Sequence, residues 1–561
     1  MRTWILTVLL AATACPMPAQ ADSEASEFTK DKQALRSWLK DYKIGAIRLV
    51  SKGQVVEAEV NRARKLMMGV SRHDNLEAAK LLFEIATLQV EQPGTSRSST
   101  SKVDFLGQIR ITAIRSMARK NIVGMNAQEV EDWLLATAKK KKGSGFKDVA
   151  NAAGAALRIL AARPSAAAKE ALLEGCRSFK PEVRVQAINA LSMTATIELV
   201  PHLFGFVRDK EPYVRIAAFN GLGRALAPHT DETVHKKIDL QVAKHRDAAI
   251  DVMGKAMISD RVWQVRAAAR ENLAGLKSKH VIPALIEGLK AELSRKKDPW
   301  ALDIKLHKTL EGLTGQKVPT GQVRIWEQFW KKEGATFKFA SVDAKPTDKK
   351  DPKYEKFFNI DLESNRVLFI VDFSGSMVED ITIKKKGVGT AAAGSKRSTT
   401  KAKLVVEELK KMVMTLKDGD LFNIIVFSDD VQLWKARKDG RPALVKMNDE
   451  MRDDLLGGYL DNLQPAGLTN LYGALEMALG FGGRGLHDKY YGLGYDTLYV
   501  LSDGAPTKGK VTDTKEILRI VKERNALTRL TIHTITFGIL NQMIFLKKLA
   551  SENGGRHIHI E

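Results

Sequence analysis

Oxygen-bearing side chains gather at three places in the C-terminal part of the chain. Asp372, Ser374 and Ser376 alternate directly after an apolar run, Thr469 stands just before a helical pattern, and Asp503 follows a second apolar run. Together they offer two carboxylates and three hydroxyls, without His or Cys. Oxygen ligands suit Mg²⁺, Mn²⁺ or Ca²⁺ better than Zn²⁺ or copper. We therefore predict a divalent-cation site, with Mg²⁺ as the first expectation.

The charge of this ligand set would let a bound cation attract a further ligand from outside the chain. Only Asp372 and Asp503 are anionic, so a bound dication is at best neutralised and still attracts another anion. Five side chains also leave room in an octahedral shell. The site is therefore expected to accept a further ligand from another molecule.

The elements that must position these residues form an α/β pattern from residue 357 onward. Strands are predicted at 366–374, 419–429, 496–504, 529–538 and 556–561, and helices at 403–416, 470–482 and 514–525. Nearly continuous apolar strands that alternate with helices indicate an open, doubly wound parallel sheet. Ligands of such sheets lie at the carboxyl ends of the strands, where the three clusters fall.

This arrangement resembles the metal-ion-dependent adhesion site of von Willebrand factor type A (VWA) domains. The family pattern is Asp-x-Ser-x-Ser, a later Thr and a still later Asp, and all five positions are occupied here. The flanking stretches "LDNLQPAGLTNLYGAL" and "LYVLSDGAPTKG" also resemble the family. The resemblance covers roughly residues 360–561 and implies a central sheet wrapped by helices. It further implies a bound cation whose shell is completed by an Asp or Glu carboxylate of a partner protein.

One segment departs from the family pattern. The helix after the site is expected to begin near "KAKLVVEELKK", so residues 378–400 are an insertion. It is rich in Gly, Ala, Ser and Thr and carries five basic residues, a composition typical of a mobile loop. Its role is left open: it steers acidic partners to the metal, or it is a passive insertion.

The middle of the chain repeats itself. Segments beginning at Val183, Val214 and Val265 each read Val-Arg-x-x-Ala-x-x-x-Leu when aligned, with an additional stretch of about twenty residues after the second. Each unit reads as two short helices that must stack on neighbours to bury their apolar faces. The units resemble HEAT repeats, which implies an α-solenoid, with a degenerate further copy near 148–162. A non-repetitive helical bundle is the alternative.

Composition divides the chain into five segments. They are a signal peptide at 1–21, a helical region at 22–164, a solenoid at 165–335, a linker at 336–356 and the VWA domain at 357–561. Trp326 and Trp330, one helical turn apart, favour a capping helix on the last repeat over a carbohydrate platform. The polar linker predicts that the parts on either side of it fold separately.

The N-terminus predicts export. Arg2, the apolar stretch 4–14 and the Ala19-Gln20-Ala21 site are typical of a secretory signal cleaved after Ala21. We expect a periplasmic or secreted, cell-surface location, with no later segment apolar enough to span a membrane. After cleavage only Cys176 remains, which excludes an internal disulfide.

Net charge narrows the class of partner. The formal charge of +23 is spread over the whole chain, and aromatic residues do not interleave with it as in a base-stacking groove. Nucleic acid is therefore a weaker expectation than an acidic protein or the anionic polymers of a cell envelope.

An enzyme is the alternative from another class. Asp372 would then be the phosphoryl-accepting nucleophile of a metal-dependent phosphatase. Many such enzymes place a carboxylic acid two residues further on, but Ser374 occupies that position and cannot act as a general acid at neutral pH. The sequence therefore favours a non-enzymatic adhesion or scaffolding protein.

Overall fold

The computed structural model describes most of the chain. It describes residues 18–87, 113–139, 149–295, 301–339, 356–384, 396–436, 444–479 and 494–560, with short gaps inside these ranges. Residues 1–17 of the predicted signal peptide and residues 340–355 of the predicted linker lie outside the described residues. Helix α1 begins at Pro18.

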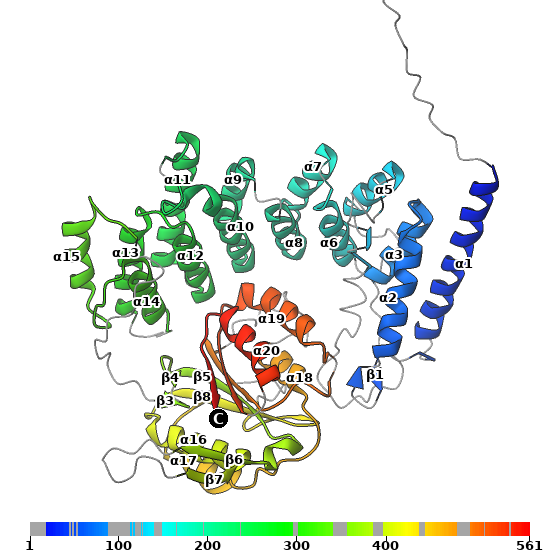
Figure 1. Ribbon diagram of the computed structural model, residues 1–561. Coiled ribbons are helices and arrows are strands. Elements are labelled where there is room, and N and C mark those ends of the chain that lie inside the picture. Colours follow the sequence, from blue (N-terminus) through cyan, green and yellow to red (C-terminus); the bar gives the residue numbers. More distant parts are fainter. Residues whose placement is uncertain are drawn as a thin grey trace, which may run out of the picture.

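Helices form a curved row in the first part of the molecule, and the C-terminal domain lies on its concave side (Figure 1). The first helices are α1 (Pro18–Lys43), α2 (Glu57–Ser71), α3 (Leu76–Ala86), α5 (Gln128–Ala138), α6 (Val149–Leu160) and α7 (Ala166–Gly175), with a small hairpin of β1 (Val50–Ser51) and β2 (Gln54–Val55). Helices α8 (Pro181–Ser192), α9 (Val200–Leu203), α10 (Pro212–Thr230), α11 (Leu240–Ser259), α12 (Trp263–Gly275), α13 (Val281–Ser294), α14 (Leu302–Thr314) and α15 (Val323–Glu333) follow.

The three predicted repeat units lie on α8, α10 and α12. Their central alanines, Ala187, Ala218 and Ala269, are fully buried, which lets neighbouring helices approach closely. The long helix α11 begins within the additional stretch after the second unit. The N-terminal part is thus an α-solenoid, as predicted.

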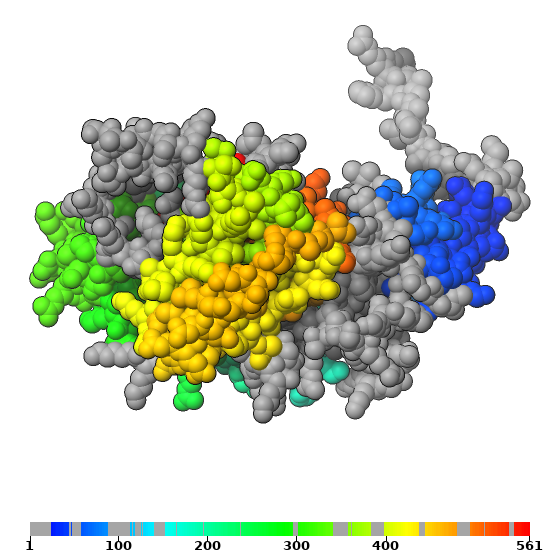
Figure 2. All heavy atoms as spheres, turned by 90° about the horizontal axis from the view of Figure 1, so that it is seen from below, coloured from blue at the N-terminus to red at the C-terminus, as the bar shows by residue number. Residues whose placement is uncertain are grey.

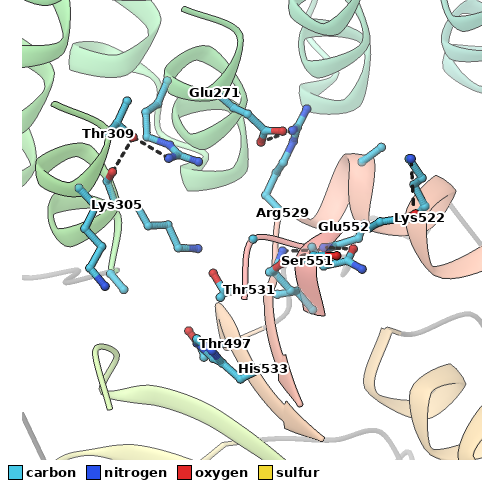
Figure 3. A pocket seen from close by; sticks show the side chains of 18 of the residues that line it. Glu271, Lys305, Thr309, Thr497, Lys522, Arg529, Thr531, His533, Ser551 and Glu552 are labelled. Carbon is cyan, nitrogen blue, oxygen red and sulfur yellow. Dashed lines mark hydrogen bonds and ion pairs between the residues drawn. The ribbon is translucent and has the colours of Figure 1, made fainter. Parts of the chain in front are cut away.

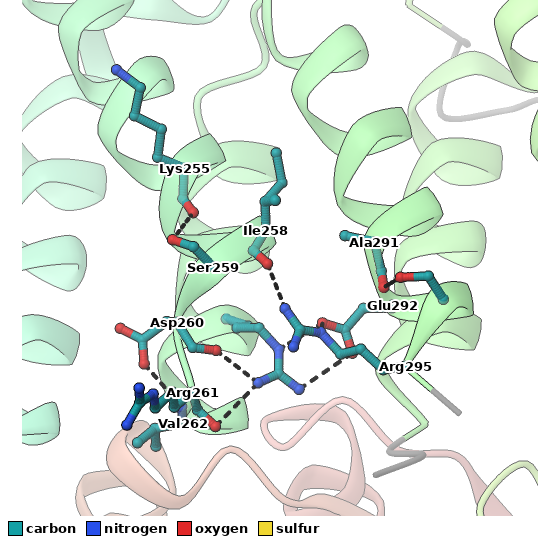
Figure 4. A network of polar contacts seen from close by, with 11 residues as sticks. Lys255, Ile258, Ser259, Asp260, Arg261, Val262, Ala291, Glu292 and Arg295 are labelled. Carbon is teal, nitrogen blue, oxygen red and sulfur yellow. Dashed lines mark hydrogen bonds and ion pairs between the residues drawn. The ribbon is translucent and has the colours of Figure 1, made fainter. Parts of the chain in front are cut away.

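The arginine of each Val-Arg pair ties its helix to the preceding loop. Nη1 of Arg184 donates to the carbonyl oxygen of Ser178 (2.8 Å), and Nη1 of Arg215 donates to that of Asp209 (2.8 Å). In the third unit, Nη1 of Arg266 donates to the carbonyl oxygen of Asp260 (2.9 Å), a residue labelled in Figure 4. The arginine at this position of each unit therefore donates to carbonyl groups of the loop that precedes its helix.

Arg266 also forms a buried ion pair across the repeat. Its Nε donates to Oε1 of Glu292 at 2.6 Å, and the two side chains are only 1% and 2% exposed. Replacing Arg266 with Met should lower the free energy of unfolding by roughly 3 kcal/mol, because it leaves a buried carboxylate whose remaining ion-pair partner is Arg295.

Urea unfolding of the single and double variants measures this effect. Arg266→Met/Glu292→Leu should recover most of the loss, since the buried carboxylate that lost its arginine partner is also removed. The exposed pair of Lys255 and Asp251 supplies the control, and Lys255→Met should change stability by less than about 0.5 kcal/mol. A double variant no more stable than Arg266→Met would contradict the buried-charge account.

Helix α15 caps the solenoid. Trp326 is fully buried and its Nε1 lies 3.3 Å from Nδ1 of His307 on α14, while Trp330 packs against Phe337. The two tryptophans are thus used in packing, which favours the capping helix over a carbohydrate platform.

The C-terminal part is a doubly wound α/β domain, as predicted. Its strands are β3 (Lys356–Phe357), β4 (Ile360–Asp361), β5 (Arg366–Asp372), β6 (Asp380–Lys384), β7 (Lys396–Thr400), β8 (Leu421–Phe427), β9 (Val431–Leu433), β10 (Val445–Lys446), β11 (Thr497–Ser502), β12 (Thr531–Phe537) and β13 (His557–Ile560). Its helices are α16 (Lys401–Thr415), α17 (Asp449–Asp454), α18 (Leu471–Leu479), α19 (Thr514–Thr528) and α20 (Leu540–Ser551).

The main sheet has the order β10-β8-β5-β11-β12-β13, with β9 also paired to β8. The five long strands from β8 to β13 are parallel, and β9 and β10 are antiparallel to β8. Successive residues of β5 enter different cores: Phe369 and Val371 face the side of α16, and Leu368 and Ile370 face the other side. The sheet is thus buried on both faces, as its apolar strands predict.

The predicted insertion is not wholly a loop. Its two ends, β6 and β7, pair as an antiparallel hairpin with Asp380 opposite Thr400, while residues 385–395 lie outside the described residues. Ile381 and Thr399 are buried in this hairpin. Helix α16 begins at Lys401, as predicted. Strand β7 contains no apolar residue, and the alternation of Ile381 and Ile383 in β6 is too short to predict a hairpin by itself.

The two parts of the molecule share a surface, which the polar linker did not predict. One apolar core runs from the solenoid helices into the face of the sheet covered by α18 and α19. The amide of Ala301, which precedes α14, donates to Oδ2 of Asp496 at 2.8 Å. Figure 2 shows the domain in front of the middle of the solenoid, with helices of the blue and green ends extending beyond it on either side. Among the described residues, none of the helices is both long and apolar enough to cross a membrane.

Candidate metal centre

The structure brings the predicted ligands to one edge of the sheet. Asp372 is the last residue of β5, and Ser374 and Ser376 follow in a short turn. Asp503 comes directly after β11, and Thr469 lies in the loop before α18. Because β5 and β11 are parallel neighbours, their carboxyl ends meet at the same edge.

Hydrogen bonds connect four of these residues. The amide of Ser374 donates to Oδ1 of Asp372 (2.8 Å), and the hydroxyl oxygens of Ser374 and Ser376 lie 3.3 Å apart. The hydroxyl of Ser376 donates to Oδ1 of Asp503 at 2.9 Å. The two strand ends, which are far apart in sequence, therefore form one polar cluster.

Backbone contacts hold Thr469 beside this cluster. Its carbonyl oxygen accepts the amide of Thr507 (3.0 Å), and its own amide donates to the hydroxyl of Thr507 (2.9 Å). A β-carbon added to Gly504, the neighbour of Asp503, would lie 3.8 Å from Oγ1 of Thr469. The Thr469 hydroxyl is thus close to the segment that carries the second carboxylate.

A glycine allows this loop to approach the serine turn. Gly467 has φ of +75°, and its carbonyl oxygen accepts the amide of Gly375 at 3.0 Å. A β-carbon at Gly467 would come within 2.5 Å of Oδ2 of Asp429, whose other oxygen accepts the amide of Leu468 (3.1 Å). Only glycine combines the left-handed backbone with this close contact.

The first carboxylate is held in a dry environment. Asp372 is fully buried, and burial raises its pKa to about 6, although hydrogen bonds from Ser502 and Ser374 favour the charged form. The hydroxyl of Ser502 donates to Oδ2 of Asp372 at 2.6 Å. The nearby charge of Asp503 raises the pKa further. A cation between these carboxylates would relieve both costs.

Lys401, the first residue of α16, also belongs to this cluster and was not predicted from the sequence. Its ammonium donates to Oδ2 of Asp503 (2.8 Å) and to Oε2 of Glu379 (2.6 Å), and the residue is 6% exposed. Burial lowers the pKa of Lys401, but the two carboxylates outweigh this effect and raise it. No sequence signal marks this lysine, because it enters the cluster from beyond the insertion.

The donor set fits a hard divalent cation. Mg²⁺ binds oxygens at about 2.1 Å in octahedral geometry, which places neighbouring ligand atoms about 3 Å apart. The separations from Oγ of Ser376 to Oδ1 of Asp503 and to Oγ of Ser374, 2.9 and 3.3 Å, match this spacing. Within the described residues, no group of three or more His, Cys, Asp and Glu is placed to hold a metal ion. The mixed carboxylate and hydroxyl cluster is therefore the metal candidate.

The sheet order and these three clusters define the class of the C-terminal part, a VWA-type domain with a Rossmann-like sheet. The N-terminal part contains HEAT repeats: the family model described as HEAT repeats matches residues 145–223. These residues include the segment near 148–162 in which a degenerate copy is expected.

Curated relatives match about a third of the chain. Inter-alpha-trypsin inhibitor heavy chain H1 of Sus scrofa is 30% identical over 200 residues, covering 35% of this chain and 19% of the relative. Heavy chain H4 of Homo sapiens is 31% identical over 196 residues, covering 34% and 18%. The chain thus spans about a fifth of the length of these relatives. A solved structure of von Willebrand factor type A from Catenulispora acidiphila aligns with a TM-score of 0.25 and 17% identity, over 35% of this chain and 38% of that one.

Proposed function

We propose that this chain is a metal-dependent protein-binding module, in which Asp372, Ser374, Ser376, Thr469 and Asp503 hold a divalent cation, with Mg²⁺ first. The observation that carries the proposal is the all-oxygen cluster of two carboxylates and three hydroxyls at the carboxyl edge of the sheet. When bound, the cation supplies positive charge for a carboxylate of the partner protein.

The surroundings of the cluster suit a surface contact. Asp372 and Ser374 are buried, whereas Ser376 is partly exposed, so the cluster opens on the side of the serine turn. Val378 and Leu468 flank this opening and are 58% and 40% exposed. Apolar side chains at the rim would shield a carboxylate–cation contact from water and strengthen it.

The same geometry supports binding over catalysis. Ser374 occupies the place where a phosphoryl-transferring site would need an acid, and its amide and hydroxyl serve Asp372 and Ser376 instead. Because a signal peptide is predicted, the protein would meet its partner outside the cytoplasm. The solenoid would then serve as the scaffold that presents the binding domain.

Affinity capture from a cell-envelope extract tests the proposal. Immobilised protein in Mg²⁺ should retain a partner that EDTA releases, and Thr469→Ala should retain much less of it, because the variant lacks one ligand hydroxyl. The exposed residue Thr233 gives a matched control, and Thr233→Ala should behave as wild type. Capture that is equal in Mg²⁺ and EDTA would exclude a metal-dependent contact.

A further inference from the structure

A cavity of about 910 Å³ lies where the solenoid meets the C-terminal domain. Helices α10, α12 and α14 form one wall, and the amino ends of β11 and β12 with the ends of α19 and α20 form the other (Figure 3). Thr497 and Thr531, the first residues of the two strands, lie on its floor. Its size is that of a site for a small organic molecule.

The wall of this cavity is strongly basic. Seven Lys or Arg residues line it, against three Glu residues. Each glutamate already has a basic partner: Glu271 pairs with Arg529 (2.5 Å), Glu552 with Lys522 (3.7 Å), and Glu363 with Lys308. Each glutamate of the wall is therefore neutralised by a basic partner, and the wall keeps a net positive charge.

Three of the basic residues have no carboxylate within 4.0 Å among the described residues. They are Arg224 on α10, Arg270 on α12 and Lys305 on α14. Nη1 of Arg270 donates to Oγ1 of Thr309 (2.9 Å), but its Nε is buried without a hydrogen-bond partner, as is Nε of Arg529. Because no carboxylate of the described residues contacts these three side chains directly, their positive charge stays available to an anion.

Burial shifts the pKa values of two ionisable groups that line the cavity. Burial lowers the pKa of Lys305 to about 8. Burial also lowers the pKa of His533 to about 3, helped by the charges of Arg556, Lys308 and Lys305. Neighbouring cations thus add to the effect of burial at His533, whereas at Lys305 the carboxylates of Asp496, Glu271 and Glu363 oppose it.

We propose that this cavity binds a small molecule carrying at least two phosphate or carboxylate groups, and that this ligand bridges the solenoid and the C-terminal domain. Arg224, Arg270 and Lys305 would bind it from the solenoid side. The volume of the cavity suits a small molecule better than a nucleic acid or an envelope polymer.

This site is distinct from the metal centre. Thr497 of the cavity and Ser502, which precedes Asp503, are the two ends of β11, about 17 Å apart along an extended strand. The two sites therefore lie at opposite edges of the sheet. Failure of one proposal leaves the other intact.

Calorimetry with inorganic triphosphate and with citrate, in EDTA and at matched ionic strength, tests the cavity. Wild-type protein should bind at least one of them and melt at a higher temperature in its presence, and the tighter one tells phosphate from carboxylate. Lys305→Met and Arg224→Gln should each weaken binding about tenfold or more, since each removes a charged donor. Neither variant breaks an ion pair, so the ligand-free melting temperature should hold.

Two controls make the outcome decisive. Lys332→Gln removes an exposed lysine of α15 that does not line the cavity, and Asp372→Asn alters the metal centre; both should bind the anion as wild type does. No binding of either probe by wild-type protein would overturn the proposal. Unchanged affinity in both Lys305→Met and Arg224→Gln, or loss of anion binding in Asp372→Asn, would overturn it as well.

Discussion

Asp372→Asn is expected to lower Mg²⁺ affinity by at least about 100-fold and to abolish metal-dependent partner binding. The variant removes one of the two anionic ligands, and a neutral amide oxygen is a much weaker ligand for a hard dication. Titration calorimetry with Mg²⁺ measures the loss directly.

The same variant should keep its fold. Both carboxylate oxygens of Asp372 accept hydrogen bonds, from the amide of Ser374 and the hydroxyl of Ser502. The asparagine oxygen can replace the first acceptor, and Ser502 can turn its donor to the carbonyl oxygen of Gly504, 3.2 Å away. Removing a buried charge should leave the melting temperature in EDTA unchanged or higher.

An exposed aspartate supplies the matched control. The side chain of Asp449 is 90% exposed, so Asp449→Asn should change neither metal affinity nor stability. Equal Mg²⁺ affinity in wild type and Asp372→Asn would show that these oxygens do not form a metal site.

Lys401→Met is expected to act in opposite directions on stability and on metal affinity. Without metal, the variant leaves the buried carboxylate of Asp503 without its ammonium partner and should lower the free energy of unfolding by roughly 3 kcal/mol. An ammonium bonded to a ligand carboxylate also repels a dication nearby, by about 1.5 kcal/mol at 5 Å in a water-like dielectric. Its removal should therefore raise Mg²⁺ affinity about tenfold.

Thermal unfolding with and without Mg²⁺ separates these effects. Lys401→Met should melt below wild type in EDTA and recover much of the difference in saturating Mg²⁺, because ligand binding stabilises the folded state. Lys403 lies in the same helical turn and is exposed, so Lys403→Met should leave both quantities unchanged. A lower Mg²⁺ affinity in Lys401→Met would mean that the lysine orients Asp503 instead of competing with the cation.

Most of the helices and strands that were predicted correctly have a recognisable local sequence pattern. The apolar runs that became β5, β8, β11 and β12, and the helices α16, α18 and α19, were recognisable because their periodicity is local. The Val-Arg-x-x-Ala units were recognisable for the same reason. The strands β9 and β10 and the hairpin of β6 and β7 were missed, since they are short and are held by pairing with other segments.

The five candidate ligands followed from the sequence by itself, because each stands at the end of an element and parallel strands end at one edge. Other features needed the tertiary structure: the partnership of Lys401 with Asp503, the core shared by the solenoid and the sheet, and the basic cavity between them. Apolar periodicity shows that a face is buried, but not against which surface. Likewise, Arg529 pairs with Glu271, which lies 258 positions earlier in the sequence. Only the folded chain shows that these two charges meet.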